Sequence, residues 1–204
     1  KFSKEDQAAF RAASNEFWDE LEQAAETGAP DGPASDFLPP DGRWNPLIQT
    51  ISTYYNGAEL EHVSVVDLGR YTDTGVNWTL RAGYGGLIAG LGAGLPGVFD
   101  CAATLIDHSG PRLKIEATKG TIEAKAVIVT IPTPLISSEA LKFHPALPEK
   151  IEAANNLPLG LADKIFFEIS GAPDLPVDGH VFGTIDSIDT ISFDLRPRGR
   201  NFVA

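Results

Sequence analysis

The chain has 204 residues, of which 43% are hydrophobic and 22% charged, which is the composition of a globular protein with a substantial core. Its net charge is −12, and residues 1–62 carry 12 acidic and only 4 basic side chains. The negative electrostatic field of these charges argues against binding to nucleic acids and anionic membranes, and it attracts cations such as amines. The alternative is that the acidic surface only keeps the protein soluble. The longest apolar run, 83–98, is broken by glycines and Pro96 and is too short for a membrane span.

The single cysteine and the first residue of the chain lead to two further expectations, one about the cellular compartment and one about the completeness of the chain. Cys101 is the only cysteine, so no internal disulfide can form, which favours a reducing compartment and a cytoplasmic location. Its side chain is expected to be a small buried hydrophobe. The chain begins at Lys1 and contains no methionine, which indicates a partial chain.

The first elements in chain order are predicted to be helices. Residues 3–27 place apolar side chains at three- and four-residue steps, with Ser3 as a cap and Gly28 as the stop. A second helix is predicted over 45–56, because Asn45 is followed by a proline suited to the first helical turn. A short helix or turn is expected at 60–66.

A strand-like segment over 76–80 and a buried, glycine-rich helix over 86–95 follow. Residues 92–97 match the GxGxxG pattern of dinucleotide-binding loops. That loop must follow a strand and open a helix, whereas this one follows a helical stretch and contains Pro96. It is therefore expected to end a helix and turn the chain.

The remainder is predicted to be rich in strands. Residues 126–131 are nearly continuous apolar and β-branched, the pattern of a strand covered on both faces. Residues 162–169 alternate, with Ile165 and Phe167 on a core face and Lys164 on the other. Other predicted elements are strands at 101–106, 113–117 and 190–195 and a helix at 148–155. Together these elements predict an α+β fold: a helical cap plus a mixed or antiparallel sheet.

Recognisable catalytic chemistry is absent from the residue pattern. The histidines are scattered and none has a second histidine or a cysteine at metal-ligand spacing. No serine lies in a nucleophile-elbow pattern or near a plausible base. The sequence chemistry alone therefore predicts no metal site and names no active site.

Several segments in order, with matching gaps, resemble the flavin-containing amine oxidase family, which includes monoamine, polyamine and L-amino-acid oxidases. The resemblance covers about residues 76–170, whereas residues 1–75 match only loosely, as a variable helical cap. The matching segments are RAGYGGLI at 81–88, ATLI at 103–106, GTIEAKAVIVTIP at 120–132, FHPALP at 143–148 and LPLGLADK at 157–164.

The resemblance implies roles for three residues. Ala103 matches a position whose backbone contacts the FAD adenine, with alanine in place of the family's valine. Pro132 matches the end of a strand that leads toward the flavin, and Lys164 matches the lysine that holds a water at flavin N5. For Lys164, an ordinary exposed strand lysine remains the alternative.

The resemblance also implies a domain assignment. Residues 1–98 would be the helical cap and central helix of the substrate domain, 99–134 strands of the FAD-binding domain, and 135–204 the substrate-domain sheet. The family's pyrophosphate-binding strand-turn-helix and its flavin-covering C-terminal segment do not occur in these residues. The chain is therefore expected to be an internal fragment that alone binds FAD weakly and is inactive.

The implied function is that of an FAD-dependent amine oxidase, which oxidises a small-molecule amine to an imine by hydride transfer to flavin and passes the electrons to oxygen or another acceptor. One alternative is a related flavin enzyme that desaturates carotenoids or oxidises porphyrinogens. Another is a non-catalytic binding domain. If one face of 126–131 is left bare, a homodimer through that face is expected.

Overall fold

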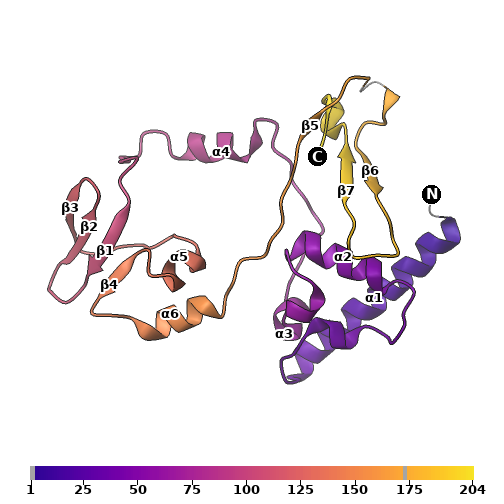
Figure 1. The fold of residues 1–204 in the computed structure, drawn as a ribbon, viewed down its shortest axis with the longest axis horizontal. Coiled ribbons are helices and arrows are strands. Elements are labelled where there is room, and N and C mark those ends of the chain that lie inside the picture. Colours follow the sequence, from indigo (N-terminus) through magenta and orange to yellow (C-terminus); the bar gives the residue numbers. More distant parts are fainter. Residues whose placement is uncertain (1–2, 172–173) are drawn as a thin grey trace. The chain divides into compact units, whose positions relative to one another are not determined.

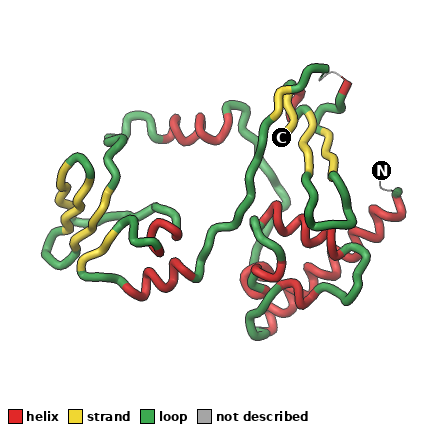
Figure 2. The backbone as a smooth tube through the Cα atoms, in the orientation of Figure 1, coloured by secondary structure: helices red, strands yellow, loops and turns green. Residues whose placement is uncertain are grey.

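The computed structural model describes residues 3–171 and 174–204, and within them the chain forms two compact units. The first unit combines residues 1–73 with 160–204, and the second comprises residues 74–159. Helices and strands are both present, and the sheets are mixed and antiparallel, so the predicted α+β class is confirmed (Figures 1 and 2). No helix among the described residues is long and apolar enough to cross a membrane.

Helices dominate the N-terminal part of the first unit. The long helix α1 spans Lys4–Thr27, with the Ser3 hydroxyl accepting a hydrogen bond from the Asp6 N–H at 3.0 Å, and it ends at Gly28 in the left-handed conformation. Both predicted caps are thus confirmed. The following elements are η1 (Ala34–Phe37), α2 (Asn45–Tyr55), η2 (Leu60–His62) and α3 (Val65–Gly69).

One hydrophobic core holds these helices together. The apolar stripe of α1 buries Phe17 and Leu21 against residues of α2, η2 and α3. The buried members of this core are Phe17, Leu21, Ala34, Trp44, Leu47, Ile48, Leu60, Val65 and Leu68. Close approach of α3 to α1 requires the glycine at 69, where a Cβ atom would lie 2.9 Å from the Ala25 Cβ.

The first unit also contains an antiparallel sheet of order β5-β8-β7-β6. Its strands are β5 (Phe167–Glu168), β6 (Gly179–Phe182), β7 (Ser192–Leu195) and β8 (Phe202–Val203), and η4 (Pro197–Gly199) lies between the last two. The sheet contacts the helices where the Phe182 ring stacks on Tyr54 of α2, with centroids 6.5 Å apart.

The second unit carries a mixed sheet of order β3-β2-β1-β4, in which β1 and β4 are parallel. Its elements are α4 (Gly83–Leu91), β1 (Ala103–Asp107), β2 (Leu113–Ala117), β3 (Gly120–Ala124), α5 (Thr133–Ser137), β4 (Lys142–His144) and α6 (Pro148–Asn155). A small core of Ile106, Ile115 and Leu141 lies against the sheet, with Val127 and Ile131 packed on it.

Several predictions about strands and burial are wrong. Residues 76–80 and 126–131 are not strands, because no described strand pairs with them, and Ile128 is 89% exposed. The predicted strand 162–169 is reduced to β5, and Ile165 and Phe167 are exposed instead of packed in a core.

Two burial predictions in the second unit also fail. The apolar helix α4 has no buried residue, because no described segment covers it. Cys101 is half-buried. The two compact units do not coincide with the boundaries at 98 and 134; the assignment of those ranges to FAD-binding and substrate domains stays a prediction.

Candidate functional site

Lys164 lies in an extended, exposed segment of the first unit. The segment is anchored four residues earlier, at Gly160, whose backbone meets the backbone of Asn56 and Gly57 at the end of α2. The Leu161 N–H donates a hydrogen bond to the Gly57 carbonyl at 2.7 Å. Within the described part of the chain no carboxylate forms an ion pair with Lys164, so its ammonium group is open to a ligand.

The close contact at this anchor depends on two glycines. A Cβ atom on Gly160 would lie 2.9 Å from the Gly57 Cα and would collide with the Asn56 carbonyl oxygen. Gly57 has φ +65°, and a Cβ there would lie 2.7 Å from the Gly160 carbonyl carbon. Side chains at either position would push the segment that carries Lys164 away from α2.

Ala103 and Pro132 both belong to the second unit. Ala103 is the exposed first residue of β1, paired with Ala117 beside an irregularity in the β1–β2 register. Pro132 is also exposed and precedes α5, with its carbonyl accepting the Leu135 N–H at 3.0 Å. It does not end a strand, which corrects that part of its predicted environment.

The ends of two family-like segments meet next to Pro132. The Thr133 hydroxyl donates a hydrogen bond to the Leu157 carbonyl at 2.6 Å. The segment that ends at Pro132 is thereby joined to the start of the segment that ends at Lys164. Residues 92–97 directly follow the end of α4 and turn the chain, as predicted, and do not open a helix.

The described residues fit FAD only in part. Ala103 at the start of β1 and Lys164 are each exposed, which a contact with a cofactor requires. A pyrophosphate needs backbone N–H groups at a glycine loop between a strand and a helix, and residues 92–97 do not have that geometry.

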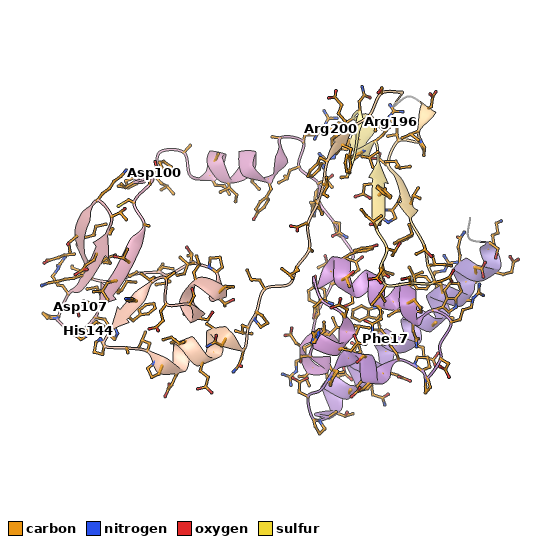
Figure 3. All side chains as sticks on the ribbon, in the orientation of Figure 1. Phe17, Asp100, Asp107, His144, Arg196 and Arg200 are labelled. Atoms are coloured by element: carbon orange, nitrogen blue, oxygen red, sulfur yellow. The ribbon has the colours of Figure 1, made fainter. Side chains whose placement is uncertain are left out.

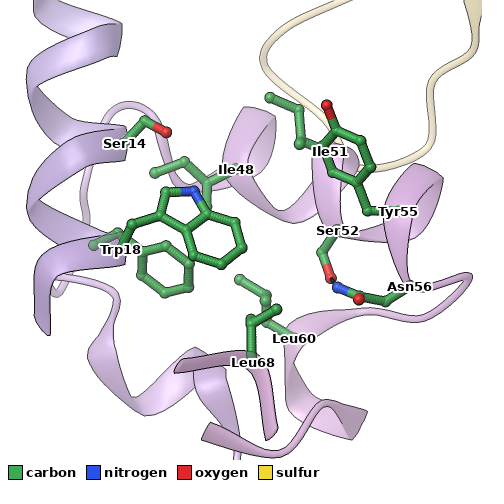
Figure 4. A pocket seen from close by; sticks show the side chains of 10 residues that line it. Ser14, Trp18, Ile48, Ile51, Ser52, Tyr55, Asn56, Leu60 and Leu68 are labelled. Carbon is green, nitrogen blue, oxygen red and sulfur yellow. Dashed lines mark hydrogen bonds between the residues drawn. The ribbon is translucent and has the colours of Figure 1, made fainter. Parts of the chain in front are cut away.

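Two cavities lie in the helical part of the first unit, and none of the predicted site residues lines them. The smaller one, of about 20 Å³, is lined by α1, α2 and their neighbours and has room for one water molecule (Figure 4). The Asn56 amide donates to the Ser52 hydroxyl at 3.0 Å on its wall. The larger one, of about 430 Å³, lies between α1 and the loop before α2.

Other polar clusters do not form a metal site. Asp107 and His144 face each other in register on β1 and β4 (Figure 3). The Ser109 hydroxyl, which donates to Asp107 at 2.7 Å, lowers the pKa of Asp107 below its ordinary value. In the described residues no group of three or more His, Cys, Asp or Glu side chains could hold a metal ion.

Comparison with known proteins decides the family. A family model described as flavin containing amine oxidoreductase matches residues 6–202. The chain belongs to this family. This membership confirms the resemblance seen in the sequence and extends it to the N-terminal helices. The chain is therefore part of a protein of the flavin-dependent oxidoreductase kind.

Two relatives match a shorter stretch. The chain is similar to the human protein "Lysine-specific histone demethylase 2", with 36% identity over 88 residues, which is 42% of this chain and 11% of that protein. The mouse protein "Lysine-specific histone demethylase 1B" is 33% identical over a stretch of the same size. The chain thus spans about 11% of the length of these relatives.

Proposed function

We propose that this chain comprises the substrate domain and part of the FAD-binding domain of a longer FAD-dependent oxidase that converts an amine to an imine. The observation that carries the proposal is the family match over residues 6–202, which includes the segment ending at Lys164. Bound FAD supplies the acceptor for a hydride equivalent from the amine α-carbon. The 204 residues alone are proposed to be inactive.

The chain's own residues have limited roles in this proposal. The Lys164 ammonium group would hold a water molecule when the flavin is bound, and the Gly57–Gly160 contact keeps the start of its segment in place. The Ala103 backbone would contact the adenine, and Pro132 would direct the chain toward the flavin. The acidic field of residues 1–62 supports an amine, which is cationic in solution, as the substrate.

A flavin enzyme acting on carotenoids or porphyrinogens is the alternative within the family, and it does not as a rule require a lysine at this position. A non-catalytic binding domain is the alternative outside it. The acidic helical region favours amine oxidation over both. The exposure of Lys164 is equally expected of an ordinary surface lysine, so it does not separate the three functions.

The test uses the protein together with its flanking coding sequence and replaces Lys164 with methionine. Flavin reduction by amine without oxygen, and reoxidation by oxygen, are measured separately. We expect one of the two rates to fall at least about tenfold, because a positioned water is lost. Lys150→Met, at an exposed position on α6, is the matched control and is expected to leave both rates unchanged. Unchanged rates in Lys164→Met would remove the catalytic assignment.

We also propose a cytoplasmic protein that forms a homodimer through residues 126–131. Ile128 is 89% exposed and Val129 38% exposed, and such apolar surface favours a partner. Analytical ultracentrifugation should give a dimer that Ile128→Lys converts to a monomer. A wild-type monomer at high concentration would rule the dimer out.

A further inference from the structure

The larger cavity of the first unit is an open groove of about 430 Å³ with an apolar floor. Phe17, Trp44 and Ile48 form the floor and belong to the buried core of the helices. Phe37 and Leu38 form a half-buried apolar wall on the opposite side from α1. The floor side chains are only 2–7% exposed, so the apolar surface that a ligand side chain could cover lies mainly on the half-buried wall of Phe37 and Leu38.

Carboxylates line both sides of this groove. Glu16 and Glu20 are exposed on α1 at a spacing of four residues, so they lie next to each other on one helix face, and Asp36 is exposed on η1. Within the described residues none of the three has an ion-pair partner. Like charges at this spacing repel each other, and a cation bound between them would relieve the repulsion.

Among the described residues that line the groove, Arg43 is the one with a cationic side chain, and it does not neutralise these acids. The Arg43 guanidinium group forms an ion pair with Asp6 at 2.8 Å and lies 4.5 Å from the centre of the Trp44 ring. Its charge is thus paired with Asp6, which is not one of the three groove carboxylates. A bound cation is therefore directed toward Glu16, Glu20 and Asp36.

We propose that this groove docks a basic peptide segment in which an apolar side chain is flanked by lysines. The apolar side chain packs against the half-buried wall of Phe37 and Leu38, as anchor residues do in protein interfaces, and the flanking ammonium groups pair with the carboxylates on the rim. A free polyamine would satisfy the charges and leave the apolar wall uncovered. The inference does not depend on the proposed amine oxidation.

The experiment measures peptide binding by calorimetry with the 204-residue chain at low salt. Three peptides of equal length are compared: alternating lysine and leucine, lysine and serine, and glutamate and leucine. We expect the lysine–leucine peptide to bind at least about fivefold more tightly than the lysine–serine peptide, and the glutamate–leucine peptide not to bind. In NMR spectra, the indole signal of Trp44 should shift and that of Trp78, which is 88% exposed in the other unit, should not.

A matched pair of double variants tests the rim. Glu16→Gln with Glu20→Gln should weaken the lysine–leucine peptide about fivefold, because two ion pairs are lost. Glu22→Gln with Glu26→Gln removes the same charge from exposed positions of α1 outside the groove and should change binding less than twofold.

Any of four outcomes would overturn the proposal. Equal weakening by both double variants, or equal affinity for the two lysine peptides, would show a general attraction to an acidic protein. Spermine binding as tightly as the lysine–leucine peptide would identify a small-amine site instead. No binding of any basic peptide would leave the groove without the proposed function.

Discussion

Replacing Gly160 with alanine should release the segment that carries Lys164 and leave the helical core folded. The added Cβ would collide with the Asn56 carbonyl oxygen and lie 2.9 Å from the Gly57 Cα. Backbone atoms at the end of α2 cannot move aside as a flexible side chain can. The segment must therefore shift, which breaks the 2.7 Å hydrogen bond from the Leu161 N–H to the Gly57 carbonyl.

The energetic cost of this shift is bounded by the contacts that are lost. One backbone hydrogen bond contributes about 0.5–1.5 kcal/mol. Leu159 is 60% exposed and Leu161 91% exposed, so little apolar burial is lost with it. We therefore expect global stability to fall by only about 1 kcal/mol, a shift of roughly 2–4 °C in Tm for a domain of this size.

Hydrogen exchange at the Leu161 amide measures the local effect. Loss of the anchor should speed exchange there about tenfold or more, while amides in α1 keep their protection. Gly90→Ala is the matched control, because no atom lies within 4 Å of a Cβ at this helical position. Unchanged Leu161 protection in Gly160→Ala would refute the steric argument, and a Tm drop well beyond this range would show that the anchor is part of the core.

Three further predictions concern the first unit. Leu21→Ala, at a fully buried position, should destabilise the chain by about 2–5 kcal/mol in chemical denaturation, whereas Leu161→Ala, at a 91% exposed one, should have little effect; equal effects would contradict the assigned core. Ser3→Ala should cost about 1 kcal/mol through loss of the α1 cap, and no change in unfolding free energy would show that the cap is not formed. The Ser64 hydroxyl, which donates to Asp31 at 2.7 Å, holds the pKa of Asp31 below its ordinary value of 3.8. The ionised Asp31 carboxylate therefore stabilises the fold above pH 3.8, and this stabilisation is lost as the pH falls through the lowered pKa. Asp31→Asn should make the unfolding free energy fall less steeply at acid pH. An unchanged dependence at acid pH would refute this.

Local signals made the helices predictable from the sequence. The cap at Ser3, the stop at Gly28 and the apolar stripe of α1 act within a few residues of each other, and the structure has all three. The proline after Asn45 likewise marks the first turn of α2. The alternation at Leu113, Ile115 and Ala117 identified β2, because its neighbours in the sheet are close in sequence.

Long-range pairing made the other strands unpredictable. Residues 126–131 have strand-like composition, but a strand needs a hydrogen-bonding partner, and no described segment supplies one. Helix α4 is apolar all round and nevertheless has no buried residue. In both places composition indicated burial, and burial depends on a covering segment that the residue pattern does not reveal.

The candidate sites also combine features that the sequence predicts with features that only the fold brings together. Lys164 was found through a family-like segment, while the glycine contact that anchors its segment joins positions 57 and 160, far apart in sequence. The acidic groove was missed because its wall and rim come from α1, η1 and the loop before α2. In the sequence, only the pair Glu16 and Glu20, which flanks Phe17 on one helix, indicates this acidic groove.

The most direct test of the central claim is an anaerobic titration with amines of the protein expressed together with its flanking coding sequence and supplied with FAD. Visible flavin absorbance is followed as mono-, di- and polyamines are added without oxygen. Amine oxidation predicts that at least one amine bleaches the flavin and that an equivalent amount of imine-derived aldehyde or ketone is formed. A protein that holds FAD, is bleached by none of these amines and is reduced by a carotenoid or a porphyrinogen would contradict the account.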